Sequence, residues 1–223
     1  MKTKNKIKKF GEDVEGYNIP VLNEREIRAS AGILFVLMFV SLMLILFKEN
    51  FLMIKYVITI FLTDLLVRVF INPKFSPTLI IGRLIVSRQV PEYVGAPQKK
   101  FAWEIGIVLA SLMFILLVVV NSYSIITGLT CLVCLAFLFF ESAFGICCGC
   151  LVYGVFYKKR AQYCAGEICD TTKKHDIQKT SWIQIFILLV LVVFVILMIL
   201  FFNDYFRTNP KNLWTILNSG ISK

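Results

Sequence analysis

Several features that organise catalytic sites are missing from this sequence. Its 223 residues contain one histidine, His175, which lies in a polar segment and is interpreted as a solvated linker residue. There is no glycine-rich loop that would cradle phosphates, no histidine-rich metal motif and no nucleophile elbow. The chain alone is therefore not expected to drive transport with ATP, and no cofactor is expected.

Charge is also scarce over five long apolar stretches. A helix rises about 1.5 Å per residue, so about 20 apolar residues cross the hydrocarbon core of a bilayer. None of the stretches alternates in polarity as the strands of a membrane barrel do. The sequence therefore predicts an all-α, polytopic membrane protein with about five transmembrane helices. They are expected at residues 29–47, 51–71, 101–121, 123–146 and 182–202.

The positive charges are unevenly distributed along the chain. The net charge is +10, and basic residues gather in three segments: seven in 1–28, five in 72–100 and six in 158–179. These segments alternate across the predicted spans, as the positive-inside rule requires. The sequence predicts a cytoplasmic N-terminus and an extracytoplasmic C-terminus. The lipid bilayer is the expected partner of the basic arm, and no nucleic acid is expected.

The spans predict a simple organisation. Short connections join the first to the second span and the third to the fourth, so the core is expected to form two helical hairpins followed by a C-terminal helix. Between the hairpins, 77–90 is predicted to be an amphipathic helix, interfacial or re-entrant. The expected parts are an N-terminal arm (1–28), a four-helix core (29–157) containing that segment (72–100), a cytoplasmic cysteine-containing linker (158–181), a fifth helix (182–202) and an extracytoplasmic tail (203–223).

Five ionisable residues fall inside the predicted spans, where charge is expensive. Lys55 is expected to extend its ammonium group to the outer interface. Asp64 and Arg68 are one helical turn apart, and Glu104 is expected in the first turn of the third span, near the positive end of its helix dipole. Glu141 lies late in the fourth span.

Asp64, Arg68, Glu104 and Glu141 are expected at one depth, in the cytoplasmic half of the bundle. One interpretation is an ion-pair network that fixes how the hairpins pack. The other is a polar cavity open to the cytosol, with Asp64, Arg68 and Glu104 as binding residues and a protonated Glu141. Both interpretations stay open.

The cysteines form a second group of candidates. Cys147 and Cys150 have the spacing of a reversible thiol pair, and with Glu141 they are the candidate catalytic residues. Cys131 and Cys134 share a helical stripe with Glu141 and are interpreted mainly as packing residues. A tetrahedral zinc site is the remaining alternative. Its four ligands would be Cys147, Cys150, Cys164 and Cys169.

Short motifs spread through the core resemble a known family. They are Asn23-x-Arg25, Asp64 with Arg68, Ser76-Pro77, Lys100-Phe101-Ala102 with Gly106, and Glu141-x-Ala143-Phe144-Gly145-x-Cys147-Cys148-Gly149-Cys150-x-x-Tyr153-Gly154. They resemble the bacterial integral membrane family called domain of unknown function 4395, over residues 21–157. The resemblance implies a four-helix core in a bacterial plasma membrane and no established activity. It also suggests a thioredoxin-like or rhodanese-like soluble partner. Cys148, the linker cysteines and the fifth helix depart from the family pattern.

Two functions are compatible with these observations. The first is thiol or sulfur redox exchange at the cytoplasmic membrane face through Cys147 and Cys150. The second is a non-catalytic membrane subunit or small-solute permease, whose charges hold the bundle together. Whether the protein is an enzyme is left open.

Overall fold

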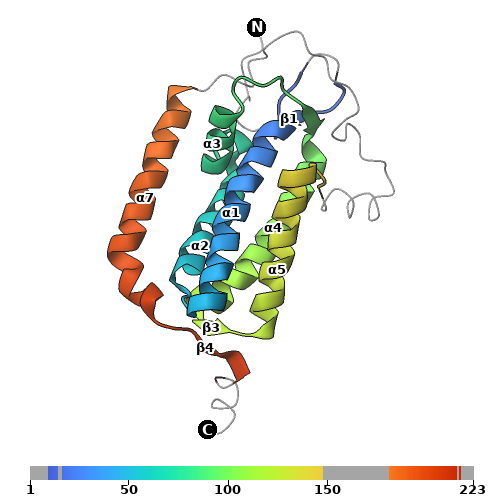
Figure 1. Cartoon of the computed structure of the whole chain (residues 1–223). Helices are drawn as coiled ribbons and strands as arrows, with labels where there is room; N and C mark the ends of the chain where they lie inside the picture. The colour runs from blue at the N-terminus through green and yellow to red at the C-terminus, as the bar shows by residue number, and fades with distance from the viewer. Residues whose placement is uncertain (1–9, 15–16, 148–180, 215, 217–223) are drawn as a thin grey trace.

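A computed structural model describes residues 10–14, 17–147, 181–214 and 216. The described part is a helical bundle with the short strands β1 (Val21–Asn23) and β4 (Lys211–Asn212) at opposite ends (Figure 1). Four of its helices form two hairpins, α1 with α2 and α4 with α5, and α7 lies at the edge. The bounds are α1 Glu24–Lys48, α2 Leu52–Leu66, α3 Pro77–Ile85, α4 Ala96–Phe114, α5 Ile125–Phe139 and α7 Trp182–Arg207. The all-α prediction is confirmed.

Three long helices end in a π-helical turn. The turn η1 (Val67–Ile71) extends α2, η3 (Ile115–Val119) extends α4, and η4 (Phe140–Phe144) extends α5. π turns inside helices are rare and are frequently found at functional sites. Two of the predicted site residues lie in such turns, Arg68 in η1 and Glu141 in η4.

Four helices are long and apolar enough to cross a membrane. They are α1, α4 continued by η3, α5 continued by η4, and α7. The predicted second span is also helical, over residues 52–71, but it carries three charged side chains. Composition and length therefore define a membrane protein with at least four candidate spans.

Two helices begin earlier than expected. The first starts at Glu24 rather than at residue 29, and the side chain of Asn23 caps it by accepting a hydrogen bond from Arg25 N. The third predicted span starts at Ala96 rather than at residue 101, with Pro97 in its first turn. Residues 24–28 and 96–100, which lie outside the predicted spans, thus belong to α1 and α4.

Two very short sheets tie the ends of the bundle. Strand β1 (Val21–Asn23) pairs antiparallel with β2 (Tyr93–Gly95). This pairing joins the start of α1 to the start of α4. At the opposite end β3 (Ser122–Tyr123) pairs in parallel with β4 (Lys211–Asn212). The predicted tail after the fifth helix therefore folds back onto the α4–α5 connection.

The amphipathic segment between the hairpins lies against α1. Helix α3 is shorter than predicted, ending at Ile85, and a 3₁₀ turn, η2 (Pro73–Phe75), precedes it. A Cβ at Gly82 would lie only 2.5 Å from the carbonyl oxygen of Glu26, so only glycine allows this approach of the two helices. This close contact positions the α3 side chains next to the first turns of α1.

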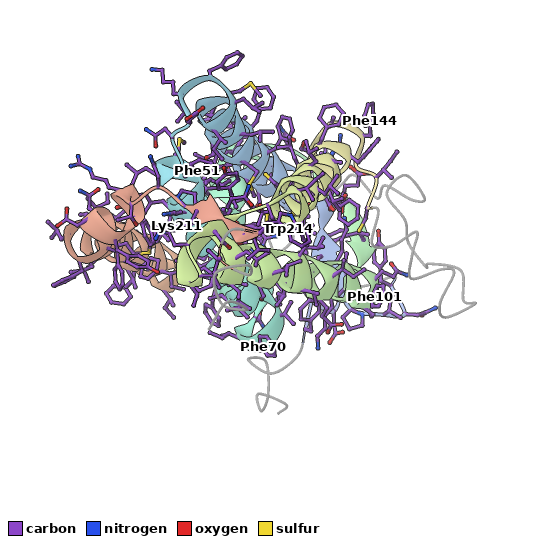
Figure 2. The ribbon with its side chains drawn as sticks, turned by 90° about the horizontal axis from the view of Figure 1, so that it is seen from below. Phe51, Phe70, Phe101, Phe144, Lys211 and Trp214 are labelled. Carbon is purple, nitrogen blue, oxygen red and sulfur yellow. The ribbon has the colours of Figure 1, made fainter. Side chains whose placement is uncertain are left out.

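The outer surface of the bundle is strongly apolar. Along α7 only Gln184, Met198 and Phe206 are buried, and Phe201 is 76% exposed. In the view along the bundle, Phe70 and Phe144 lie at its periphery (Figure 2). Such a surface requires lipid around it.

Candidate functional site

A cavity of about 70 Å³ lies between α1, α2, α4 and α5. Most of its lining is apolar, including Leu34 and Phe61. Arg68 and Glu141 provide its charged groups, and Cys134 contributes a thiol. The volume suffices for a few water molecules or a solute of a few heavy atoms. The structure thus brings together three residues that the sequence singled out.

Arg68 is held by a compact polar cluster beside this cavity. Its Nε donates to Asp64 Oδ2 at 2.7 Å, and its Nη2 donates to the hydroxyl groups of Ser30 and Thr78, each at 2.6 Å. Asp64 also accepts from the hydroxyl of Ser76 at 2.7 Å and from Thr78 N at 3.0 Å. Ser76 caps α3, so this cluster joins α1, α2 and α3. The predicted Asp64–Arg68 pair is therefore present in the structure.

One edge of the Arg68 guanidinium is not used by this cluster. The hydrogen bonds among the described residues engage Nε and Nη2, and none of them engages Nη1. The guanidinium also stacks on Trp103, with its central carbon 5.1 Å from the ring centroid. The guanidinium of Arg68 is thereby held in one orientation where Arg68 lines the cavity.

A second ion pair joins α1 to α3. Arg83 donates from Nε and Nη2 to Oε2 of Glu26, at 3.1 and 3.0 Å, while Asn23 Nδ2 donates to Oε1 at 3.0 Å. This pair was not predicted, although Arg83 interrupts the apolar face of its helix and could have signalled a buried partner.

Nearby, burial raises the pKa of the Tyr93 phenol well above its ordinary value, so the phenol stays neutral.

The third cluster contains two carboxylates and one lysine. Nζ of Lys99 lies 2.7 Å from Oε2 of Glu24 and 2.5 Å from Oε1 of Glu141. Lys99 is 1% exposed and Glu24 is fully buried, whereas Glu141 is half-buried and borders the cavity. Lys99 and Glu24 lie outside the predicted spans, so no pattern in the sequence pairs them with Glu141.

The structure gives Lys55 partners that the sequence does not indicate. Its side chain is fully buried within the protein. Its Nζ donates to Asn121 Oδ1 at 2.7 Å, to the carbonyl of Thr208 at 2.8 Å and to that of Phe206 at 3.3 Å. The chain after α7 folds over this end of the bundle and supplies two of these acceptors, which the pattern of a single helix cannot indicate.

The expected position of Glu104 is wrong. Because α4 begins at Ala96, Glu104 lies in the third turn of the helix rather than the first, and its side chain is exposed. Within the part of the chain that the structure describes, it makes no hydrogen bond or ion pair with Asp64, Arg68 or Glu141. The structure therefore does not bring this predicted binding residue into the cluster.

The described thiols are buried and free. Cys131 and Cys134 lie on α5, and Cys134 borders the cavity about two helical turns before Glu141. Cys147 follows the left-handed Gly145 that ends η4, and Arg28 Nη2 donates to the Ala143 carbonyl there at 3.2 Å.

The zinc prediction depends largely on residues outside the described part. Cys150, Cys164 and Cys169 lie there, as does most of the predicted linker 158–181. Among the residues that are described, no group of three or more potential metal ligands is found. The four-cysteine site therefore stays a prediction.

Fold and site together define a helical membrane protein with a polar-ended cavity and buried charge clusters at one end of its bundle. Residues 22–158 match the family described as "Domain of unknown function (DUF4395)", and the chain belongs to that family. All three charge clusters lie within the matched residues. Neither a curated protein nor a solved structure matches the chain.

Proposed function

We propose that the protein spans the bacterial plasma membrane five times and carries a small polar solute through the cavity of its bundle. In this arrangement the N-terminus is cytoplasmic and the C-terminus is extracytoplasmic. The three basic segments of the sequence support the orientation, since they would all lie on the cytoplasmic side. The helix over residues 52–71 can span because its three charges are buried within the bundle rather than facing lipid.

The cavity is the observation that carries this proposal. Interior sites between helices are where bundles bind small ligands, with apolar walls and a few fixed polar groups. Here the walls are apolar, while Arg68 offers a donor edge and Glu141 offers a carboxylate. A solute of a few heavy atoms with a polar or anionic group fits this chemistry.

The partners of Arg68 support the cavity rather than contacting the solute. Asp64 and the hydroxyl groups around it fix the guanidinium of Arg68 in one orientation. A fixed donor loses less conformational freedom on binding than a mobile one. The network is thus expected to shape the site, as well as to hold α1, α2 and α3 together.

The test is uptake of small radiolabelled anions (formate, acetate, sulfate and thiosulfate) into vesicles containing the full-length protein. Ala102→Leu would fill the cavity from α4, and we expect it to slow uptake roughly tenfold, equivalent to ~1.4 kcal/mol. Val108→Leu, on the exposed face of the same helix, is the matched control. Equal uptake by the Ala102 variant and the control would reject the cavity as the route.

A second candidate function is sulfur exchange, which Cys134 on the cavity wall and Cys147 at the end of η4 favour. In this reaction the Cys147 thiolate attacks the outer sulfur of a persulfide on a rhodanese-like or thioredoxin-like partner. The sulfur–sulfur bond of the partner breaks, its thiolate leaves, and Cys147 becomes the persulfide. Cys150 could then attack the inner sulfur of this persulfide, forming a disulfide and releasing hydrosulfide.

Acid-quenched alkylation of native membranes, with peptide mapping and a metal assay, tests the second candidate. Cycling of Cys147 and Cys150 between thiol and persulfide or disulfide on thiosulfate challenge would support it. Cys131→Ser is the control, because Cys131 is buried away from the helix end. Thiols that stay fully alkylatable and metal-free under every challenge would leave solute transport as the remaining function.

A further inference from the structure

Among the described residues at the cytoplasmic end of the bundle, the buried charges leave one carboxylate without a cation of its own. Among the described residues, Arg68 pairs with Asp64 and Arg83 pairs with Glu26. Lys99 alone faces two carboxylates. If both were ionised, the cluster of Glu24, Lys99 and Glu141 would hold a net negative charge inside the protein.

Glu24 is the residue where this imbalance is most costly. Its side chain is completely buried, and the only donor that it meets in the described part of the chain is the ammonium group of Lys99, 2.7 Å from Oε2. Oε2 has the ion pair with Lys99, while Oε1 has no polar contact there. A buried carboxylate with an unsatisfied oxygen is unfavourable by several kcal/mol in ionised form, and binding a proton removes that charge.

Within the part of the chain that the structure describes, the charged groups on the surrounding elements do not supply the missing cation. The loop before β2 adds Glu92, whose carboxylate has the same sign as that of Glu24. On α1, Arg28 is engaged with the Ala143 carbonyl at the end of η4. On α4, the ammonium of Lys100 lies over the ring of Phe10.

We propose that Glu24, Lys99 and Glu141 together form a proton-binding site that holds one exchangeable proton. The proton comes from water and converts one of the two carboxylates to a carboxylic acid. Lys99 then balances the carboxylate that stays ionised. Release returns the proton to water and leaves two carboxylates on one ammonium.

The site lies between two spaces that are accessible to small molecules. Glu141 borders the inner cavity, whereas the next residue, Ser142, borders a hollow of about 370 Å³ that Arg25 and Arg28 also line. The turn η4 therefore separates the hollow from the cavity, with the carboxylate pair beside it. Proton uptake would make the polar end of the cavity more positive, which favours an anionic solute there.

This coupling to an anion rests on the proposed transport function, but the proton site does not. Infrared spectroscopy of the full-length protein in phosphatidylethanolamine–phosphatidylglycerol vesicles at neutral pH tests the site directly. We expect the carbonyl band of one protonated carboxylic acid, shifted on exchange into D₂O. The band should be lost completely in Glu24→Gln or Glu141→Gln, since Lys99 then faces a single carboxylate.

Glu49→Gln, in the exposed turn between α1 and α2, is the matched control and should keep the band. If one of the two glutamine variants does not fold, the other still decides the question. Loss of the band in at least one of them supports the site. Absence of the band from the wild-type protein, or its persistence in both variants, would overturn the proposal. Because no solute is present, failure of solute transport would not change this result.

Discussion

The two ends of the bundle bury charge in different ways. At the end where β1 and β2 pair, cations lie against carboxylates, as in the Arg68–Asp64 pair. At the end where β3 and β4 pair, Lys55 is fully buried, and its described hydrogen bonds go to one amide oxygen and two backbone carbonyls. These carbonyls belong to the C-terminal end of α7, where the helix dipole is negative. A buried cation thus needs a negative potential, which either a carboxylate or a helix end can provide.

This difference predicts different sensitivity to mutation. A carboxylate left alone is a buried charge, whereas carbonyls left alone are unsatisfied dipoles. Loss of the cation should therefore be more damaging at the carboxylate end.

The largest effect is expected at Arg68. Arg68→Met would leave Asp64 ionised and unpaired in the interior, which costs about 3–5 kcal/mol. The measurement is unfolding of the detergent-solubilised protein by denaturant titration. The double variant Asp64→Asn with Arg68→Met should recover much of the loss, because it removes the uncompensated charge. Equal destabilisation of the single and double variants would contradict the ion-pair explanation.

A smaller loss is expected at the opposite end. Lys55→Met would remove three hydrogen bonds and leave their acceptors buried, at about 1 kcal/mol each. The C-terminal end of α7 should then detach, exposing the bond after Arg207 to limited proteolysis by trypsin. Lys48→Met, at the exposed end of α1, is the control. Equal rates of cleavage after Arg207 in both variants would show that Lys55 does not hold α7.

Helix packing at the carboxylate end gives a third comparison. Gly82→Ala would bring a Cβ to 2.5 Å from the Glu26 carbonyl, so α3 must move away from α1. Such overpacking costs about 2 kcal/mol. Gly128→Ala, where a Cβ meets nothing within 4 Å, should instead stabilise α5 by up to ~1 kcal/mol. Thermal unfolding measured in parallel distinguishes the two, and a loss of stability at both glycines would refute a specific α1–α3 contact.

The smallest effect is expected at Glu104. It is exposed on α4, so Glu104→Gln should change the free energy of unfolding by less than about 0.5 kcal/mol. The same denaturant titration provides the measurement. A larger loss would show that Glu104 has a structural partner.

Local features of the structure could be read from the sequence. The helices follow from long apolar runs, and Asp64 meets Arg68 because they are one turn apart. The family and the helical membrane class follow from the same regions. Contacts of this kind depend on residues that are near one another in the chain.

Contacts between distant segments could not be read in this way. Lys99 meets Glu24 and Glu141 because α4 begins several residues before its apolar stretch. Its first turn contains Pro97, which the sequence places in the segment between the two hairpins. The same early start moved Glu104 out of the first turn. Lys55 is buried because the end of α7 and the residues after it pack against Lys55 and Asn121. The spacing of residues within α2 cannot predict this contact with a distant segment.

The attachment of α7 has a consequence for the membrane itself. The helix is fixed at one end by Gln184, which donates to the Lys74 carbonyl at 3.2 Å, and at the other by Lys55 and by Tyr205, whose hydroxyl donates to Val118 O at 2.7 Å. Its 26 residues extend about 39 Å, somewhat more than the ~30 Å hydrocarbon thickness. A helix without such attachments would tilt when the bilayer becomes thinner. Because α7 is fastened at both ends, a change in bilayer thickness would instead strain the bundle at these two attachments.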